Sequence, residues 1–163
     1  MRDKETNPSR AAVVAGLLLA AVALPAAQRS GTEDVKNIEQ RVSAFLTAFD
    51  NLDWRAFRSF WDAQATVFHP DASHQKRIET PGEFDRAWQE VFDQIKKDSH
   101  RSAPPYVNLQ PADLRVTLLS QDVALVTFHL ESEERFGRRT LVWKRTADGW
   151  KLVHLHASNF SSR

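Results

Sequence analysis

Residues 138–158 read RRTLVWKRTADGWKLVHLHAS, and this segment decides the fold. Two runs rich in β-branched and aromatic residues flank Ala147-Asp148-Gly149, and Asp-Gly between such runs is a strong hairpin signal. The second run ends in His154 and His156. Because side chains two apart on a strand point to the same face, the two imidazoles are expected to project together. The segment therefore predicts an antiparallel hairpin with a pair of histidines on one face.

The first half of the chain carries mainly helical signals. Apolar residues at spacings of three and four predict a helix over 30–50 that opens on the capping box of Ser30 and Glu33. A short second helix over 54–61 is expected to be capped by Asp53. Residues 65–69 are a short strand candidate that stops at Pro70.

A third helix has the clearest start in the sequence. Thr80-Pro81-Gly82-Glu83 combines a threonine cap, a proline in the first turn and a glutamate at the third position. Helical spacing of apolar residues continues from there to Ile95. Strand signals follow at 114–119, 123–131, 138–145 and 150–158. Helices first and an antiparallel meander last indicate an α+β fold.

One of these predicted strands is apolar on both faces. Residues 123–128 read VALVTF. Such a strand is expected to be covered on both sides, by helices on one face and by a second subunit on the other. The pattern therefore predicts a homodimer.

The N-terminus is typical of a secretory signal peptide. A head containing Arg2, Lys4 and Arg10 precedes residues 11–27, which carry no charge and end in small residues. The apolar run is shorter than the roughly 20 residues of a spanning helix. We expect a signal peptide over 1–27, an exported (periplasmic or secreted) protein, and one domain over 28–163. The alternative is an uncleaved anchor, which would be the chain's only membrane contact.

Composition excludes some functional classes. Residues 1–27 hold three of the 22 Lys and Arg and two of the 21 Asp and Glu, which leaves 19 of each sign. A neutral domain is not typical of a nucleic-acid binder. The chain has no cysteine, so neither disulfides nor thiolate metal sites are available. Ten Phe and five Trp supply apolar area for a core instead.

The order of elements and three segments resemble the SnoaL-like branch of the nuclear transport factor 2-like superfamily over about residues 33–160. The segments are 50–67, 80–88 and the hairpin of 140–158. The hairpin is similar to that of the association domain of calcium/calmodulin-dependent kinase II. The resemblance implies a cone-like curved sheet wrapped around the N-terminal helices, with a pocket at its open end. This fold hosts enzymes, binding proteins and oligomerisation modules, so it does not fix the function.

The ketosteroid isomerases of that superfamily have a strand that resembles residues 65–70. The resemblance implies a catalytic base where this chain has His69, and a tyrosine hydroxyl where it has Phe45. Phenylalanine cannot donate to an enolate oxygen, and losing such a donor costs about 2.7–4 kcal/mol of barrier. Steroid isomerisation is therefore not expected. His69 remains the candidate general base, because imidazole titrates near neutral pH. The alternative is a hydrogen-bonded histidine at the rim.

His154 and His156 admit two interpretations. A His-x-His pair on a strand suits zinc geometrically, with His129 or Glu131 as a further ligand. Proteins that resemble this chain are not, as a family, metalloproteins. We therefore expect the two imidazoles to line the pocket, and we expect neither a metal nor a cofactor.

The penultimate strand has two distinct faces. Arg139, Leu141 and Trp143 share one of them. An arginine beside an aromatic ring in a concave pocket suits a small carboxylate. The resemblance to association domains, which hold such acids, points the same way. Trp61, next to the pocket strand, is also expected to line the cavity. Most of the strand's other cations are expected to protect a solvated edge.

Two functions follow from these patterns. The first is a binding domain for a small organic ligand, an acid among the candidates, without chemistry. The alternative is a cofactor-independent enzyme that transfers a proton with His69 as base, as an isomerase, lyase or hydrolase would. A hydrogen-bond donor paired with His69 would separate the two, and the sequence offers none that can be recognised. This favours binding.

Overall fold

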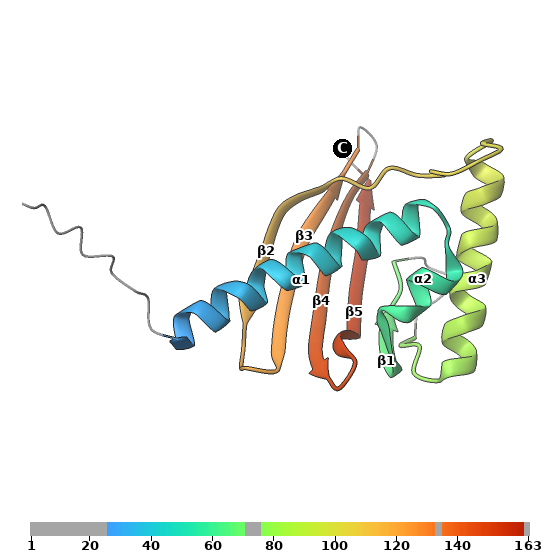
Figure 1. Cartoon of the computed structure of the whole chain (residues 1–163). Helices are drawn as coiled ribbons and strands as arrows, with labels where there is room; N and C mark the ends of the chain where they lie inside the picture. Colours follow the sequence, from blue (N-terminus) through green and yellow to red (C-terminus); the bar gives the residue numbers. More distant parts are fainter. Residues whose placement is uncertain (1–25, 71–75, 133–134, 162–163) are drawn as a thin grey trace, which may run out of the picture.

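The computed structural model describes residues 26–70, 76–132 and 135–161 (Figure 1). A long helix, α1, is followed by a short helix and strand, a third helix and four strands. Their bounds are α1 Ala26–Asp50, α2 Trp54–Ser59, β1 Trp61–Phe68, α3 Pro81–Asp98, β2 Pro111–Leu118, β3 Val123–Glu131, β4 Arg135–Thr146 and β5 Gly149–Ser161. The chain has the predicted α+β architecture, with a curved sheet.

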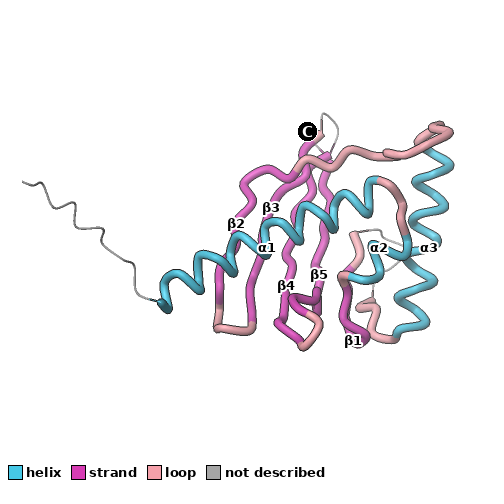
Figure 2. Tube along the Cα trace, in the orientation of Figure 1, coloured by secondary structure: helices cyan, strands magenta, loops and turns pink. Residues whose placement is uncertain are grey.

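The strands form one sheet in the order β1-β5-β4-β3-β2 (Figure 2). Consecutive strands from β2 to β5 pair antiparallel, as predicted for a meander. β1 pairs parallel with β5, so the first strand lies beside the last. A bridge between Val67 and Ile78 adds a short pairing to β1.

The helices cover one face of this sheet. In Figure 1, α1 crosses in front of the strands and α3 stands beside β1. The aromatic core lies between them, with Phe57 at its centre, fully buried and in ring contact with Phe45, Trp88 and Phe92. Inner-face side chains of the sheet, Val126, Leu141 and Leu152 among them, complete the core. This packing fixes the strands and α3 relative to α1.

Local sequence signals explain two of the helix starts. Asp53 caps α2 by accepting a hydrogen bond from the Ala56 N–H at 3.0 Å. Thr80 accepts from the Glu83 N–H, and the Glu83 carboxylate accepts from the Thr80 N–H. This reciprocal capping box satisfies two N–H groups that have no partner within the helix. The predicted caps at Asp53 and Thr80 are confirmed.

Two predicted boundaries are wrong. α1 begins at Ala26, before the expected cap at Ser30. Trp61 opens β1 instead of ending the second helix, because β1 pairs with β5. Trp61 aligns with Leu152, and the Leu152 N–H donates to the Phe60 carbonyl at 2.8 Å. The sheet's hydrogen bonds thus end the helix. β1 stops at Phe68, so His69 follows the strand.

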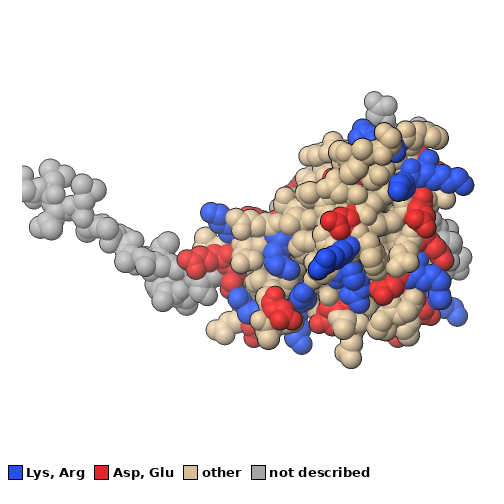
Figure 3. All heavy atoms as spheres, turned by 45° about the vertical axis from the view of Figure 1, so that its right-hand side comes forward, with Lys and Arg blue, Asp and Glu red and all other residues tan. Residues whose placement is uncertain are grey.

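The outer face of the sheet carries apolar side chains as well. Leu125 and Val142 are paired across β3 and β4 and are half-buried, and Phe68 is 38% exposed. Elsewhere, Lys and Arg are interspersed with Asp and Glu over the face in Figure 3. No helix in the described part of the chain is long and apolar enough to cross a membrane. The predicted signal peptide lies mostly within residues 1–25, outside the described residues.

Candidate functional site

A cavity of about 690 Å³ opens between the inner face of the sheet, α1 and α3. It lies toward the start of β4 and the end of β5, where Arg135 and Ser161 pair. Apolar side chains form much of its wall, among them Phe45, Phe49, Trp88, Phe128, Leu141 and Leu155. Cavities of this size hold small organic molecules.

β4 brings two arginines to this cavity, Arg135 and Arg139, and Arg139 is the more buried of the two. Arg139 pairs with Phe128 of β3 and Ala157 of β5, both buried on the inner face. Its Nη1 donates to the carbonyls of Arg138 at 2.8 Å and Ser158 at 3.1 Å. Its Nη2 donates to Asn159 Oδ1 at 3.0 Å. All three acceptors are neutral, and no carboxylate of the described residues pairs with Arg139.

Burial without a counter-charge has an electrostatic consequence. Desolvation lowers the pKa of Arg139 from its ordinary value to about 10. The guanidinium is still a cation at neutral pH. An anion that entered the cavity would therefore find an unneutralised positive charge in a low-dielectric wall, where charge-assisted hydrogen bonds are strong.

Gly137 makes room for this guanidinium. It is buried on the same face of β4, two residues before Arg139, and pairs with Asn159. A methyl group at Gly137 would lie 2.9 Å from both Arg139 Nη1 and Asn159 Oδ1. The absence of a side chain thus lets the Arg139 side chain fold back over the strand.

His69 lies in the same cavity wall as Arg139. Its ring centroid is 5.2 Å from that of Trp88 on α3, at an interplanar angle of 74°. Asp98, also in the wall, accepts two hydrogen bonds from Gln94, at 2.8 and 2.9 Å. Arg135, the second arginine of the wall, is exposed and lies at the same end of the cavity. The cavity therefore combines an apolar body with several polar groups.

The other expected pocket residues lie elsewhere. Trp61 and Trp143 are almost completely buried in the core and are not among the cavity's lining residues. His154 and His156 share a face, as the strand period predicts, but it is the outer face of the sheet. The expectation that they line the cavity is corrected by this placement. The strand alternation puts them opposite Leu155, which does line it.

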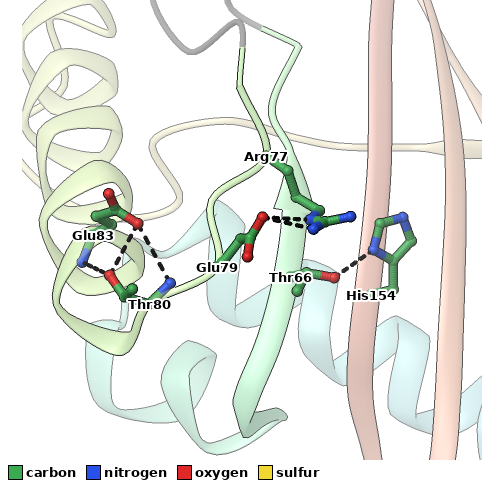
Figure 4. A network of polar contacts seen from close by, with 6 residues as sticks. All are labelled: Thr66, Arg77, Glu79, Thr80, Glu83 and His154. Atoms are coloured by element: carbon green, nitrogen blue, oxygen red, sulfur yellow. Dashed lines mark hydrogen bonds and ion pairs between the residues drawn. The ribbon is translucent and has the colours of Figure 1, made fainter.

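His154 belongs to a polar cluster at the junction of β1 and β5 (Figure 4). Its Nδ1 lies 2.7 Å from the Thr66 hydroxyl oxygen. Burial, together with the positive charges of His156 and Arg77, lowers the pKa of His154. No group of three metal-ligating side chains occurs among the described residues. His129, which the sequence pattern offers as a further ligand, lies against Phe136 with ring centroids 4.8 Å apart and an interplanar angle of 43°.

Sequence reasoning missed Trp88, Gly137 and Asn159. Trp88 is on the predicted apolar face of α3, where core and cavity residues look alike. Asn159 falls one residue beyond the predicted end of the last strand, whereas β5 continues to Ser161. Extending the alternation of Leu155 and Ala157 by one step would have placed Asn159 beside Arg139.

The curved sheet with helices over one face is the fold of nuclear transport factor 2-like proteins, as comparison with solved structures shows. The model of the SnoaL-like domain matches residues 38–161, so the chain belongs to the SnoaL-like family. Among curated proteins, none matches the chain.

Solved structures support the same class. A protein of the nuclear transport factor 2-like family from Streptomyces avermitilis is 22% identical with a TM-score of 0.64, over 79% of this chain and 97% of that one. A ketosteroid isomerase-like protein from Erwinia carotovora atroseptica is 18% identical with a TM-score of 0.63, over 80% and 98%. The association domain of the C. elegans calcium/calmodulin-dependent kinase II is 22% identical with a TM-score of 0.59, over 81% and 98%. At these identities the likeness shows the fold alone.

Proposed function

We propose that this domain binds a small organic acid in the cavity between the sheet, α1 and α3. The observation that carries the proposal is Arg139, a cation in the cavity wall whose hydrogen-bond partners are all neutral. Burying an unpaired charge is costly, and a bound carboxylate would offset that cost. The rings of Phe45, Phe49 and Trp88 offer an apolar surface to the body of the acid.

Ligand-observed NMR tests this proposal with phenylacetate and its neutral amide as probes. We expect the acid to bind more tightly than the amide, and Arg139→Gln to remove the difference. Arg115→Gln is a matched control, since Arg115 is an exposed arginine of β2 that does not line the cavity. Equal binding of acid and amide by the wild type would contradict the proposal. Native mass spectrometry of the purified protein would show an acid that co-purifies.

The second candidate function is proton transfer by His69 on a ligand held by Arg139. It is favoured by one observation, that both side chains line the same cavity. A solved relative is described as ketosteroid isomerase-like, which keeps an enzyme among the options. His69→Ala would then abolish turnover of a candidate substrate and leave its affinity nearly unchanged. Unchanged turnover in this variant would exclude His69 as the base.

Two further features belong to this proposal. Homodimerisation through the outer face of the sheet is supported by Leu125, Val142 and the exposed ring of Phe68. The association domain of a calcium/calmodulin-dependent kinase II shares the fold. Export is supported by the uncharged run of residues 11–27 behind a basic head. Analytical ultracentrifugation tests the first, and N-terminal sequencing of protein from an exporting host tests the second.

A further inference from the structure

The hydrogen bonds of Arg139 leave a specific pair of donors free. A guanidinium has five N–H groups in one plane. Both Nη1 protons are directed to backbone carbonyls, those of Arg138 and Ser158, and one Nη2 proton is directed to Asn159. Two protons remain, one on Nε and one on Nη2, and no acceptor from the described residues is bonded to Nε.

Gly137 and Asn159 lie against the guanidinium of Arg139. Arg139 Nη1, Arg139 Nη2 and Asn159 Oδ1 are the three atoms nearest to the place a Gly137 side chain would occupy, at 2.9, 3.2 and 2.9 Å. The missing side chain at Gly137 and the hydrogen bond from Nη2 to Asn159 Oδ1 thus help to hold the guanidinium in place. The N–H groups left over, on Nε and Nη2, can donate to the two oxygens of a carboxylate.

We propose that Gly137 and Asn159 are positioning residues that hold Arg139 so that its two remaining N–H groups, on Nε and Nη2, bind the carboxylate of the ligand. The inference rests on the proposed function and adds to it the two residues that position Arg139. A phosphonate of the same body carries a third oxygen for which these two N–H groups offer no further donor, so phenylacetate is expected to bind more tightly than benzylphosphonate.

Two substitutions separate positioning from the mere presence of Arg139. Asn159→Asp gives the guanidinium a carboxylate of its own, which would compete with the ligand while Arg139 stays in place. Gly137→Ala would push its methyl group into Arg139 Nη1 and Asn159 Oδ1. Asn37→Asp adds the same charge at an exposed position of α1, and Gly82→Ala adds a methyl group where no atom lies within 4 Å. These two are the matched controls.

The experiment measures the affinity of each variant for phenylacetate, benzylphosphonate and phenylacetamide by calorimetry. The wild type is expected to prefer phenylacetate. Asn159→Asp and Gly137→Ala are expected to lose about tenfold to a hundredfold of that affinity, the range for a hydrogen bond to a charged group. Both controls should bind as the wild type does. Two-dimensional NMR of the arginine Nε–H groups is expected to show one cross-peak that moves with phenylacetate and is absent in Arg139→Gln.

The outcomes distinguish a failure of the proposed function from a failure of the positioning inference. If the wild type binds phenylacetate no better than phenylacetamide, the proposed function is wrong and the positioning inference falls with it. If binding depends on Arg139 but Asn159→Asp and Gly137→Ala retain wild-type affinity, only the positioning inference is overturned. An unmoved Nε–H cross-peak at saturating phenylacetate would overturn it too. If Gly137→Ala fails to fold, the NMR spectrum of Asn159→Asp still tests the positioning inference.

Discussion

The side chain of Asp50, the last residue of α1, accepts a hydrogen bond from the backbone N–H of Leu109 at 3.0 Å. The Asp50 carbonyl also accepts from Tyr106 at 2.7 Å and Val107 at 3.4 Å. One residue thus ties the segment before β2 to the end of α1. Val107 and Leu109 line the cavity, so this connection also holds part of its wall.

We expect Asp50→Ala to lower the free energy of unfolding by about 1 kcal/mol, the usual net value of one hydrogen bond. Asp50→Asn keeps an acceptor for Leu109 and should cost less. Desolvation raises the pKa of Asp50 above its usual 3.8, an effect that the Leu109 hydrogen bond partly opposes. Stability from this group is therefore present below pH 3.8 and is lost as the pH rises through the folded pKa. In urea titrations from pH 3 to 7, the free energy of unfolding of Asp50→Asn should rise relative to that of the wild type. A difference between the two that stays constant over this pH range would contradict the prediction.

The pKa of His154 predicts the opposite pH dependence. Burial lowers it first, and the charges of His156 and Arg77 add to the effect. The unfolded chain therefore takes up the proton before the folded one, so stability is present above about pH 6.5 and falls as the solution is acidified. We expect the free energy of unfolding of His154→Gln to fall less than that of the wild type between pH 7 and 5. In His156→Gln, an NMR titration should find the pKa of His154 raised, though still below its usual value. An unchanged His154 titration would exclude the interaction.

Phe57 is expected to be among the most costly core positions. It is fully buried, and its ring meets those of Phe45, Trp88 and Phe92 within 5.2 Å between centroids. Phe57→Ala should lower the free energy of unfolding by about 3–5 kcal/mol through lost contacts and a cavity. Phe160→Ala, at a ring that is 46% exposed, is the control with a small effect. Equal effects of the two in chemical denaturation would contradict the packing described.

Thr80 tests the start of the helix that carries Trp88. Thr80→Ala removes the acceptor for the Glu83 N–H and should cost about 1 kcal/mol. Thr80→Ser retains the hydroxyl and should stay near the wild type. Thermal unfolding monitored by circular dichroism measures both, and an alanine variant as stable as the serine variant would show that the cap contributes little.

Periodicity predicted the fold well where burial on one face enforces it. The structure confirms the hairpin around Asp148-Gly149, the apolar face of α3 and the two faces of β4. Burial specifies the register of β4 strongly, because a shift of one residue would turn Leu141 and Trp143 out of the core. The placement of Trp61 at the start of β1 depends on pairing with Leu152, which is distant in the sequence. No local pattern contains that information.

The site was harder to predict for a related reason. The curvature of the sheet and the boundaries of β5 decide which face meets the cavity, so His154 and His156 were assigned to the wrong one. Alternation grouped Arg139 with Leu141 and Trp143, and the resemblance to association domains suggested that this face meets the pocket, as the cavity's lining by Arg139 and Leu141 bears out. Gly137 and Asn159 matter only through their contacts with its guanidinium, which nothing in their own sequence neighbourhood announces.

The parallel pairing of β1 with β5 has a consequence for the order in which the chain can fold. During synthesis, residues 61–68 are made about 90 residues before their partners at 152–156, so β1 cannot pair with β5 until the last strand of this sheet has been made. Contacts this distant in sequence slow folding, because a long loop must close before they form. A nascent chain that ends before Gly149 would lack both β5 and the docking place of β1. The domain therefore cannot complete its sheet until β5 is available to pair with both β1 and β4.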